Sequence, residues 1–259
     1  MGSSQIHSTA LVDPSATLGE GTTVGPYCVV GEGVQLGKNC QLHHHVSLSG
    51  PSTFGDENNF HPFACIGGQS QDLKYQGEPT WLRVGSRNTF REFVTVNRAT
   101  DQGDATEIGD DCHFLAYAHV GHDCQIGHHV IFSNNGTLAG HVVVEDHAIL
   151  GGLSAVHQFC RIGRHAFIGG CAKVTQDVPP YMMADGNPAR MRDINRVGLQ
   201  RKGMSESQLK DLYRAFRTLY RSELNTSQAL DRLAEHDQPL PEVVEIMTFV
   251  RESQRGITR

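Results

Sequence analysis

The stretch VGHDCQIGHHVIFSNNGTLAGHVVVEDHAIL, residues 120–150, carries an aliphatic side chain or a phenylalanine at every sixth position. The same phase runs from Ile6 to Val174, and only Asp72, Glu78 and Gln102 depart from Leu, Ile, Val or Phe. The residue four places after each such position is usually small. One large and one small interior residue in every six are typical of a hexapeptide parallel β-helix, in which three hexads form a triangular coil and residues one coil apart stack.

The three exceptions lie in two segments that interrupt the repeat, 67–83 and 97–107. We expect both segments to leave the prism as loops, because the hexad phase resumes after them at Val84 and Ile108. Loops on a rigid scaffold often carry binding groups. A tolerated surface insertion is the alternative interpretation of each loop.

The repeat ends near residues 177–190, DVPPYMMADGNPAR, whose prolines and glycine interrupt it. Beyond this segment three helix starts have recognisable capping residues. They are Ser205 with Gln208, Asn225 with Gln228, and Pro241 in a first turn. The chain is therefore predicted to be mainly β and to have three parts: the parallel β-helix over residues 1–178, a linker over 179–190 and a C-terminal α-helical domain over 191–259.

Composition and charge exclude several classes of protein. The chain has 259 residues and a net charge of −6, which does not suit binding to nucleic acid. Its first residues lack the basic start and apolar run of a signal peptide, and no run approaches the ~18 apolar residues of a transmembrane helix. Seven cysteines without paired CxxC spacing indicate reduced thiols, and hence a cytoplasmic protein.

The hexad phase also predicts where the side chains of YAHVGHDC (117–124) point. Cys124 occupies an inward small position, so we interpret it as a packing residue. His122 and Asp123 follow the interior Val120 and face outward near a corner of the prism. Stacking of successive coils places further residues in the same exterior region: His119, Gly140, His141, His157 and Gln158.

An outward histidine beside an aspartate can serve as a general base, because the carboxylate orients the ring and stabilises the imidazolium that forms. The backbone amide of Gly140, which has no side chain in the way, can hold an oxyanion. No serine, cysteine or lysine of this cluster is an evident nucleophile, which favours direct transfer to a substrate hydroxyl. An exterior site needs a second surface that excludes water, so we expect it to lie between the subunits of a trimer.

Several motifs together closely resemble one family of hexapeptide-repeat acyltransferases. They are QDLKYQGEPT (71–80), AHVGHDCQIG (118–127), TLAGHV (137–142), VHQFCRIG (156–163), DVPPY (177–181) and RGITR (255–259). The family is that of the bacterial acyl-carrier-protein–UDP-N-acetylglucosamine O-acyltransferases, and the resemblance covers almost the whole chain. It implies a left-handed β-helix and a homotrimer. It also implies transfer of an (R)-3-hydroxyacyl group from acyl carrier protein to the 3-hydroxyl of UDP-N-acetylglucosamine, the first step of lipid A biosynthesis.

The resemblance implies roles for individual residues as well. His122 matches the general base, Asp123 the residue that supports it, and Gly140 the oxyanion donor. The residues that match substrate-binding positions are Gln71, Asp72, Lys74, His119, His141, His157, Gln158, Asn195 and Arg201. Gly170 resembles the position that gauges acyl length, and a glycine there implies room for a longer chain. No metal and no cofactor is implied, because the acyl group arrives on the phosphopantetheine of acyl carrier protein.

Two residues depart from the family pattern. Asn97, in Asn97-Arg98-Ala99-Thr100, stands where the family commonly has the histidine of HRGT, and Gly68 stands where an acidic residue is usual. Neither departure affects the predicted base. Both a 3-hydroxyl and a 3-amino group on the acceptor sugar are compatible with these motifs.

A basic segment independently indicates an acidic partner. Residues 161–202 contain eight basic and three acidic residues, a balance of 8 − 3 = +5 in a chain whose total is −6. A basic end on an acidic protein steers an acidic partner such as acyl carrier protein. A charged face that is merely solvated is the alternative.

Other functions compete with this interpretation. The N-acyltransferase of the same pathway normally has an additional N-terminal domain, whereas the hexads here begin at Ile6. A coenzyme A-dependent acetyltransferase lacks the motif at 71–80. A zinc enzyme of the γ-carbonic-anhydrase type would use His119, His122 and His141 as ligands between subunits. A non-catalytic scaffold gives no reason for the two loops.

Overall fold

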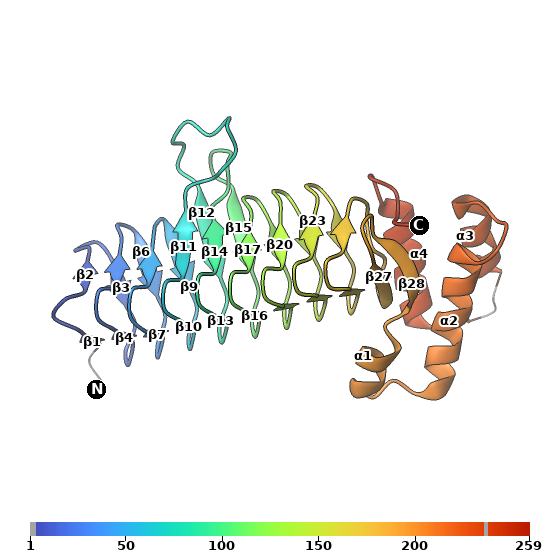
Figure 1. Ribbon diagram of the computed structural model, residues 1–259, viewed down its shortest axis with the longest axis horizontal. Helices are drawn as coiled ribbons and strands as arrows, with labels where there is room; N and C mark the ends of the chain where they lie inside the picture. Colours follow the sequence, from blue (N-terminus) through green and yellow to red (C-terminus); the bar gives the residue numbers. More distant parts are fainter. Residues whose placement is uncertain (1–3, 236–237) are drawn as a thin grey trace.

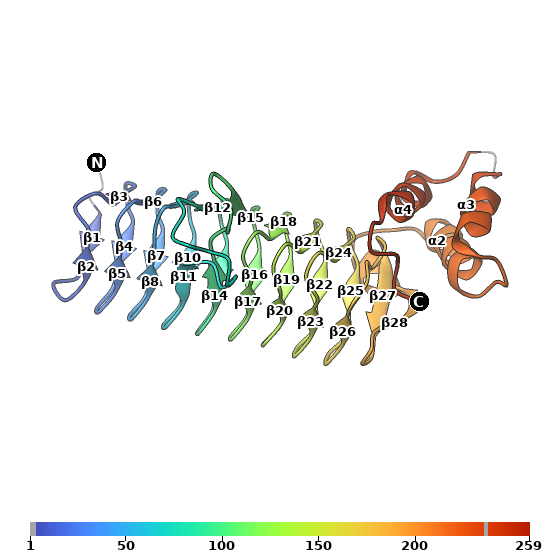
Figure 2. The same ribbon diagram turned by 90° about the horizontal axis from the view of Figure 1, so that it is seen from above.

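The chain folds into a long three-sided prism with a group of helices at its C-terminal end (Figures 1 and 2). This computed structural model describes residues 4–235 and 238–259. Residues 1–3 of the predicted β-helix therefore lie outside the described residues. Short strands repeat along the prism and stack into three parallel sheets, which form its three faces. The coil is left-handed, as the family resemblance implies.

Sheets A, B and C each take one strand from every coil. Sheet A consists of β1 (Gln5–Ile6), β4 (Thr23–Val24), β7 (Gln41–Leu42), β10 (Asn59–Phe60), β13 (Thr89–Phe90), β16 (His113–Phe114), β19 (Ile131–Phe132), β22 (Ile149–Leu150), β25 (Phe167–Ile168), β27 (Met182–Asp185) and β28 (Arg190–Ile194). Sheet B consists of β2 (Leu11–Val12), β5 (Val29–Val30), β8 (Ser47–Leu48), β11 (Cys65–Gly68), β14 (Thr95–Asn97), β17 (His119–Val120), β20 (Thr137–Leu138), β23 (Ala155–Val156) and β26 (Lys173–Val174). Sheet C consists of β3 (Thr17–Leu18), β6 (Val34–Leu36), β9 (Ser52–Phe54), β12 (Trp81–Val84), β15 (Ala105–Ile108), β18 (Gln125–Ile126), β21 (Val143–Val144) and β24 (Arg161–Ile162).

The two loops fit into the prism because their lengths preserve the hexad phase. In most of the prism, stacked residues are 18 apart in sequence. Across the first loop Phe54 pairs with Val84, an offset of 30 residues, and across the second loop Val84 pairs with Ile108, an offset of 24. The loops thus add two hexads and one hexad, which accounts for the three polar positions in the sequence repeat.

The corners of the prism align outward side chains in columns. We call the corners AB, BC and CA after the sheets that they connect. The third residue after each interior position commonly has a positive φ, for example Asp123 at 61° and His141 at 59°, both at corner BC. Because the same backbone turn recurs in each coil, the residues with positive φ at one corner lie one above the other along the outside of the prism.

The interior repeats in the same way. Phe60, Phe90, Phe114 and Phe132 are fully buried, and their rings follow one another at centroid distances of 4.9–5.2 Å. The predicted packing cysteines Cys28, Cys40, Cys112, Cys124 and Cys160 are fully buried. Burial raises the pKa of the Cys124 thiol to about 12, so this group is a neutral packing residue and not a nucleophile.

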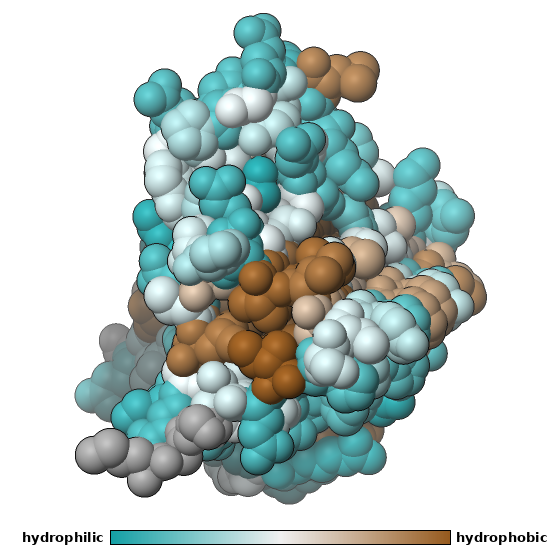
Figure 3. Space-filling view, turned by 90° about the vertical axis from the view of Figure 1, so that its left-hand side faces the viewer, coloured by the Kyte–Doolittle hydropathy of each residue, from teal (hydrophilic) through white to brown (hydrophobic). Residues whose placement is uncertain are grey.

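The N-terminal end of the prism leaves part of its interior uncovered. Figure 3 looks onto this end and shows an apolar patch surrounded by hydrophilic residues. Ile6 and Leu11 are exposed there, and Val12 and Leu18 are only partly buried. A coil is fully covered only when it has a neighbour on each side, so the first coil retains apolar surface.

The C-terminal end of the prism is closed by a hairpin. The segment 179–190, expected as a linker, instead contains β27, which pairs in parallel with β25, and leads into the antiparallel β28. The prolines break the hexad repeat, but the backbone after them still extends sheet A. The chain end returns to the same region, where Ile257 forms a bridge with Asp177.

Among the residues described after the hairpin, the chain forms four helices, and their starts confirm the capping prediction. They are α1 (Arg196–Arg201), α2 (Glu206–Tyr220), α3 (Thr226–Ala234) and α4 (Pro241–Glu252). Ser205 with Gln208 and Asn225 with Gln228 form complete capping boxes, and Pro241 occupies the first turn of α4. In the part of the chain that the structure describes, no helix has the length and apolar character needed to cross a bilayer.

Candidate active site

Both loops and the turn that holds His122 leave the prism at corner BC. β11 leads into the first loop, β14 into the second, and β17 into His122 and Asp123. β14 pairs with β11 on one side and with β17 on the other, so the three connections lie in successive coils. The loops project from one edge of the prism in Figure 1, and β17, which leads to His122, follows β14 in the next coil.

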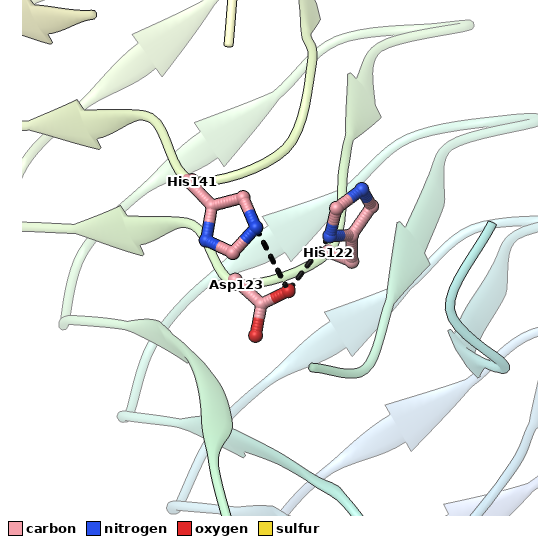
Figure 4. A group of neighbouring side chains, drawn as sticks. All are labelled: His122, Asp123 and His141. Atoms are coloured by element: carbon pink, nitrogen blue, oxygen red, sulfur yellow. Dashed lines mark hydrogen bonds and ion pairs between the residues drawn. The ribbon is translucent and has the colours of Figure 1, made fainter. Parts of the chain in front are cut away.

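His122 and Asp123 form a hydrogen-bonded pair, as predicted. Nδ1 of His122 lies 2.7 Å from Oδ2 of Asp123, and Figure 4 shows both side chains with His141 around the same carboxylate oxygen. Nε2 of His141 lies 3.6 Å from that oxygen. Since an ionised carboxylate only accepts hydrogen bonds, it favours the tautomer with a proton on Nδ1 of His122, which leaves Nε2 free to act as a base.

Thr100 of the second loop binds the same pair. Its backbone N–H donates to Oδ1 of Asp123 at 3.1 Å, and its Oγ1 lies 3.0 Å from Nδ1 of His122. Burial of Asp123 disfavours its charge, but the hydrogen bonds from His122 and Thr100 outweigh this cost and hold the pKa of the carboxyl below its ordinary value. Asp123 is therefore ionised at neutral pH and able to stabilise an imidazolium.

Gly140, one coil after His122, lies against the His122 imidazole. A Cβ atom added to Gly140 would stand 2.3 Å from Cε1 of His122 and 2.5 Å from Nε2, distances that only glycine avoids. Among the described residues, the amide N–H of Gly140 has no hydrogen-bond acceptor. An unpaired amide beside the free nitrogen of the imidazole is the arrangement expected of an oxyanion donor next to a base.

Two more predicted histidines lie close to the pair. The His141 ring meets the His122 ring edge-on at 5.1 Å and stacks on Phe159 at 4.6 Å. Nδ1 of His119 lies 2.7 Å from Oγ1 of Thr95. Burial, aided by the nearby His122, lowers the pKa of His119, so its imidazole is neutral near pH 7.

The residues that could hold a metal ion in the structure differ from the zinc ligands His119, His122 and His141 of the alternative function. His122, Asp123 and His141 present three ligand atoms within 4.8 Å of one another, and His119 is not among them. Tetrahedral ligands that share one zinc at ~2.0–2.1 Å would be about 3.3 Å apart. The 2.7 Å contact between His122 and Asp123 is shorter and suits a shared proton.

The first loop holds its predicted binding residues at the surface. Gln71 and Lys74 are exposed, and Asp72 is half-buried. The loop reaches the pair through Ser70, whose Oγ lies 2.7 Å from Oγ1 of Thr100 and accepts the N–H of Asp72 at 3.2 Å. Asp72 and Lys74 are linked to each other by a hydrogen bond of 2.9 Å from the Lys74 N–H to the Asp72 carboxylate.

The remaining predicted residues fall into two groups. His157 and Gln158 follow β23 at corner BC, in the coil next to Gly140, as their stacking predicts. Both are exposed, and within the described ranges neither bonds to His122 or Asp123. Gly170 follows β25 at corner AB. Asn195 and Arg201 line a cavity of about 390 Å³ over sheet A, where Asn195 caps α1. The chain therefore does not bring Gly170, Asn195 or Arg201 together with the His122 pair.

The two departures from the family pattern are neighbours. Gly68 of β11 pairs in register with Asn97 of β14, and a Cβ atom added to Gly68 would come within 3.4 Å of the Asn97 amide nitrogen. That amide donates to the carbonyl oxygen of Gln69. In this chain a glycine and an asparagine thus meet at the base of the first loop.

Sequence reasoning missed Thr100 and Ser70. Stacking by coils could not find them, because both lie in loops that leave the hexad repeat. The one signal in the sequence was their position in the segments 67–83 and 97–107, which interrupt the hexad repeat; Ser70 also directly precedes the motif QDLKYQGEPT (71–80).

Comparisons with known proteins find relatives over the full length of the chain. A family model described as Udp N-acetylglucosamine O-acyltransferase, domain 2, matches residues 177–258. A model described as bacterial transferase hexapeptide (six repeats) matches residues 105–140.

Curated relatives and solved structures are similar to this chain over almost its full length. The acyl-[acyl-carrier-protein]–UDP-N-acetylglucosamine O-acyltransferase of Verminephrobacter eiseniae is 49% identical over 99% of this chain and 100% of its own length. The protein of the same name from Herminiimonas arsenicoxydans is 45% identical over 99% and 100%. The crystal structure of UDP-N-acetylglucosamine O-acyltransferase from Moraxella catarrhalis is 39% identical, covers 98% of this chain and 99% of that one, and has a TM-score of 0.94.

Proposed function

The chain belongs to the acyl-[acyl-carrier-protein]–UDP-N-acetylglucosamine O-acyltransferase family and is an acyltransferase, and on that premise we propose the reaction and mechanism that follow. The protein transfers an (R)-3-hydroxyacyl group from acyl carrier protein to the 3-hydroxyl of UDP-N-acetylglucosamine. This reaction is the first step of lipid A biosynthesis. The observation that carries the proposal is the 2.7 Å His122–Asp123 contact beside the unpaired amide of Gly140.

The proposed reaction is a single displacement. Nε2 of His122 removes the proton of the sugar hydroxyl while that oxygen attacks the thioester carbonyl carbon. The carbonyl electrons move to its oxygen, which the Gly140 amide stabilises in the tetrahedral intermediate. When the intermediate collapses, the C–S bond breaks and His122 returns its proton to the departing thiolate.

Asp123 acts on this reaction through the imidazole. During attack His122 becomes an imidazolium, and the ionised carboxylate at 2.7 Å stabilises that charge. The carboxylate also fixes the ring orientation. No covalent acyl-enzyme is needed, since Cys124 points into the prism and has its pKa raised to about 12.

We propose a homotrimer with its sites between subunits, supported by how the candidate substrate residues are divided. The base lies at corner BC, whereas Gly170 lies at corner AB and Arg201 near sheet A. A neighbouring prism that packed against corner BC could supply the second set. Leu73, in the first loop, is fully exposed and offers an apolar contact to such a neighbour.

An exposed aromatic column offers a second apolar surface to a partner prism. Tyr27, Phe63, Phe93 and Tyr117 are exposed along corner AB, and Phe63, Phe93 and Tyr117 stack at 4.8–5.1 Å. A column of this kind along a prism edge is typical of a surface that is covered on assembly.

The basic segment supports the proposal that acyl carrier protein docks at the C-terminal end. Some of its arginines are already neutralised, since Arg161 pairs with Glu145 and Arg164 with Asp146 and Glu245. Others have no carboxylate partner within the described residues: Lys173, Arg190, Arg192 and Arg201. These cations remain available to attract an acidic protein.

The proposed reaction needs no metal and no cofactor beyond the phosphopantetheine arm of acyl carrier protein. We also propose a cytoplasmic location, in keeping with seven cysteines that are all free.

The test is mass spectrometry of products from UDP-N-acetylglucosamine and a mixture of (R)-3-hydroxyacyl carrier proteins, with a chelator present. We expect an O-acylated sugar nucleotide and a loss of about 10²–10⁴-fold in His122→Ala. The matched control is His113→Ala, at an exposed histidine of sheet A. Activity near the wild-type level in folded His122→Ala would contradict the mechanism, and activity that required added zinc would favour metal chemistry.

A further inference from the structure

Thr100 holds both members of the catalytic pair from the second loop. Its N–H donates to Oδ1 of Asp123, and its Oγ1 lies 3.0 Å from Nδ1 of His122. Resting on the proposed function, we propose that Thr100 is a positioning residue for the base and that Ser70 of the first loop acts through it. The two loops would then set the orientation of His122 as well as bind substrate.

The proton positions follow from the acceptors around Nδ1. If Thr100 donated to Nδ1, that nitrogen would carry a lone pair facing the Asp123 carboxylate at 2.7 Å, an unfavourable contact. Nδ1 therefore carries the proton, which Oδ2 of Asp123 accepts and Oγ1 of Thr100 can share. The Thr100 hydroxyl hydrogen must then point elsewhere, and Ser70 Oγ at 2.7 Å is its acceptor.

Ser70 completes the connection to the first loop. Its Oγ also accepts the N–H of Asp72, a predicted sugar-nucleotide contact. The chain of hydrogen bonds thus runs from the backbone of Asp72 through Ser70 and Thr100 to the imidazole. Only 6% of Thr100 is exposed, so water cannot readily replace a missing hydroxyl.

The surroundings keep Thr100 in place. Arg98, two residues before it, is buried, and the Arg98 guanidinium donates to the carbonyl oxygens of Gly67, at the start of the first loop, and of Gly50, between β8 and β9. The Arg98 N–H donates to the carbonyl oxygen of Gly68 at 2.8 Å. Because the backbone is anchored by other contacts, removal of the Thr100 hydroxyl should disturb the imidazole more than the loop.

This arrangement predicts an effect on turnover and not on binding. Thr100 faces the far side of the imidazole from Nε2, so substrate contacts do not depend on it directly. Loss of its hydroxyl should allow the ring to rotate or to change tautomer, and fewer bound complexes would have Nε2 aligned with the sugar hydroxyl. The Michaelis constant for the sugar nucleotide should change little.

The test measures kcat and KM in Thr100→Val, Thr100→Ser, Ser70→Ala and the Thr100→Val/Ser70→Ala double variant. We expect Thr100→Val, which keeps the hydrogen bond from the backbone N–H of residue 100 to Asp123, to lower kcat about 10- to 100-fold, the cost of one hydrogen bond in a charged network. KM should stay within about threefold, and Thr100→Ser should recover most of kcat. Ser70→Ala should lower kcat in the wild-type background but not further in Thr100→Val, because residues that act through one another are not additive.

The control is Thr22→Val, at a buried threonine far along the prism whose hydroxyl donates to the carbonyl oxygen of Gly37. It should cost stability while kcat is retained. A folded Thr100→Val with kcat within about twofold of the wild type, or a Thr100→Ser as slow as Thr100→Val, would overturn the inference. Should Thr100→Val not fold, an undiminished kcat in Ser70→Ala would overturn it as well. Absence of transfer by the wild type would refute the proposed function and this inference together, whereas an active wild type with an unaffected Thr100→Val refutes the inference alone.

Discussion

The imidazole of His122 lies directly against the α-carbon of Gly140, where an added Cβ atom would stand 2.5 Å from Nε2. The proposed base and the proposed oxyanion donor are therefore packed together, and the site has no room for a methyl group at position 140. The His122 side chain therefore keeps its position only if the residue stacked on it in the next coil, residue 140, is a glycine.

Gly140→Ala should lower kcat by about 10²-fold, because the methyl group would push the imidazole out of line while the amide is retained. Steady-state kinetics on the folded variant checks this. Gly31→Ala is the matched control, since its added Cβ would come no nearer than 3.2 Å, to the carbonyl oxygen of Leu48. Equal kcat values for the two variants would contradict the packing argument.

Asp123→Asn should lower kcat by at least about 10²-fold with a small effect on stability. The amide that replaces the carboxylate can donate to Nδ1 of His122, which favours the tautomer with the proton on Nε2 and removes the base. Single-turnover measurement with saturating acyl carrier protein would test the chemical step directly. A variant whose chemical step kept the wild-type rate would show that Asp123 has no part in orienting the imidazole.

Gly170→Met should shorten the hydroxyacyl chain that the enzyme prefers. An added Cβ at Gly170 would meet only the carbonyl oxygen of Gly152, at 3.4 Å, so the variant should fold normally while its side chain extends outward. Competition among donors of different length, read by the mass of the product, gives the measurement. An unchanged product distribution would exclude Gly170 as a residue that limits chain length.

Arg190→Glu combined with Arg192→Glu should raise KM for acyl carrier protein about tenfold, because both exposed cations lie in the basic segment and have no carboxylate partner within the residues described. Activity with a short acyl-phosphopantetheine thioester should be unchanged. Lys38→Glu, an exposed charge reversal toward the N-terminal end, is the control. Equal losses with the protein donor and the small donor would contradict a docking role.

Stability should fall between about pH 6.5 and pH 4 because of His165 at corner CA. Burial, reinforced by His147, Lys202 and Arg164 and opposed by Asp146, lowers the pKa of His165 to about 4. The unfolded chain, with a histidine pKa near ~6.5, takes up the proton first as the pH falls, so unfolding is favoured in that window and unaffected above it.

His165→Phe can replace the stacking of His165 on His147 and Tyr181, where ring centroids are 4.6 and 5.7 Å away, without adding a titratable group. The free energy of unfolding at a fixed protein concentration should therefore decline less from pH 7 to pH 5 in the variant than in the wild type. Parallel declines would show that His165 does not contribute.

Much of the fold could be predicted because the hexad is a local rule. A residue such as Val120 is interior and His122 is exterior in every coil, whatever the rest of the chain does. The capping boxes at Ser205 and Asn225 are equally local. The segment 179–190, predicted as a linker, instead contains β27, because pairing with β25 of the preceding coil extends sheet A past the prolines that interrupt the repeat.

By itself the sequence determined the prism, the inward orientation of five of its seven cysteines, and the outward stacking of His122, Asp123, Gly140 and His141, since each depends only on the period of six. The tertiary structure alone decided that Thr100 and Ser70 meet this cluster, because loop backbones follow no period and their hydrogen bonds form across coils. It also decided that Gly170, Asn195 and Arg201 lie away from His122 within the chain. The corners of a triangular coil face different directions, so residues that belong to one predicted pocket can lie on different sides of the same prism.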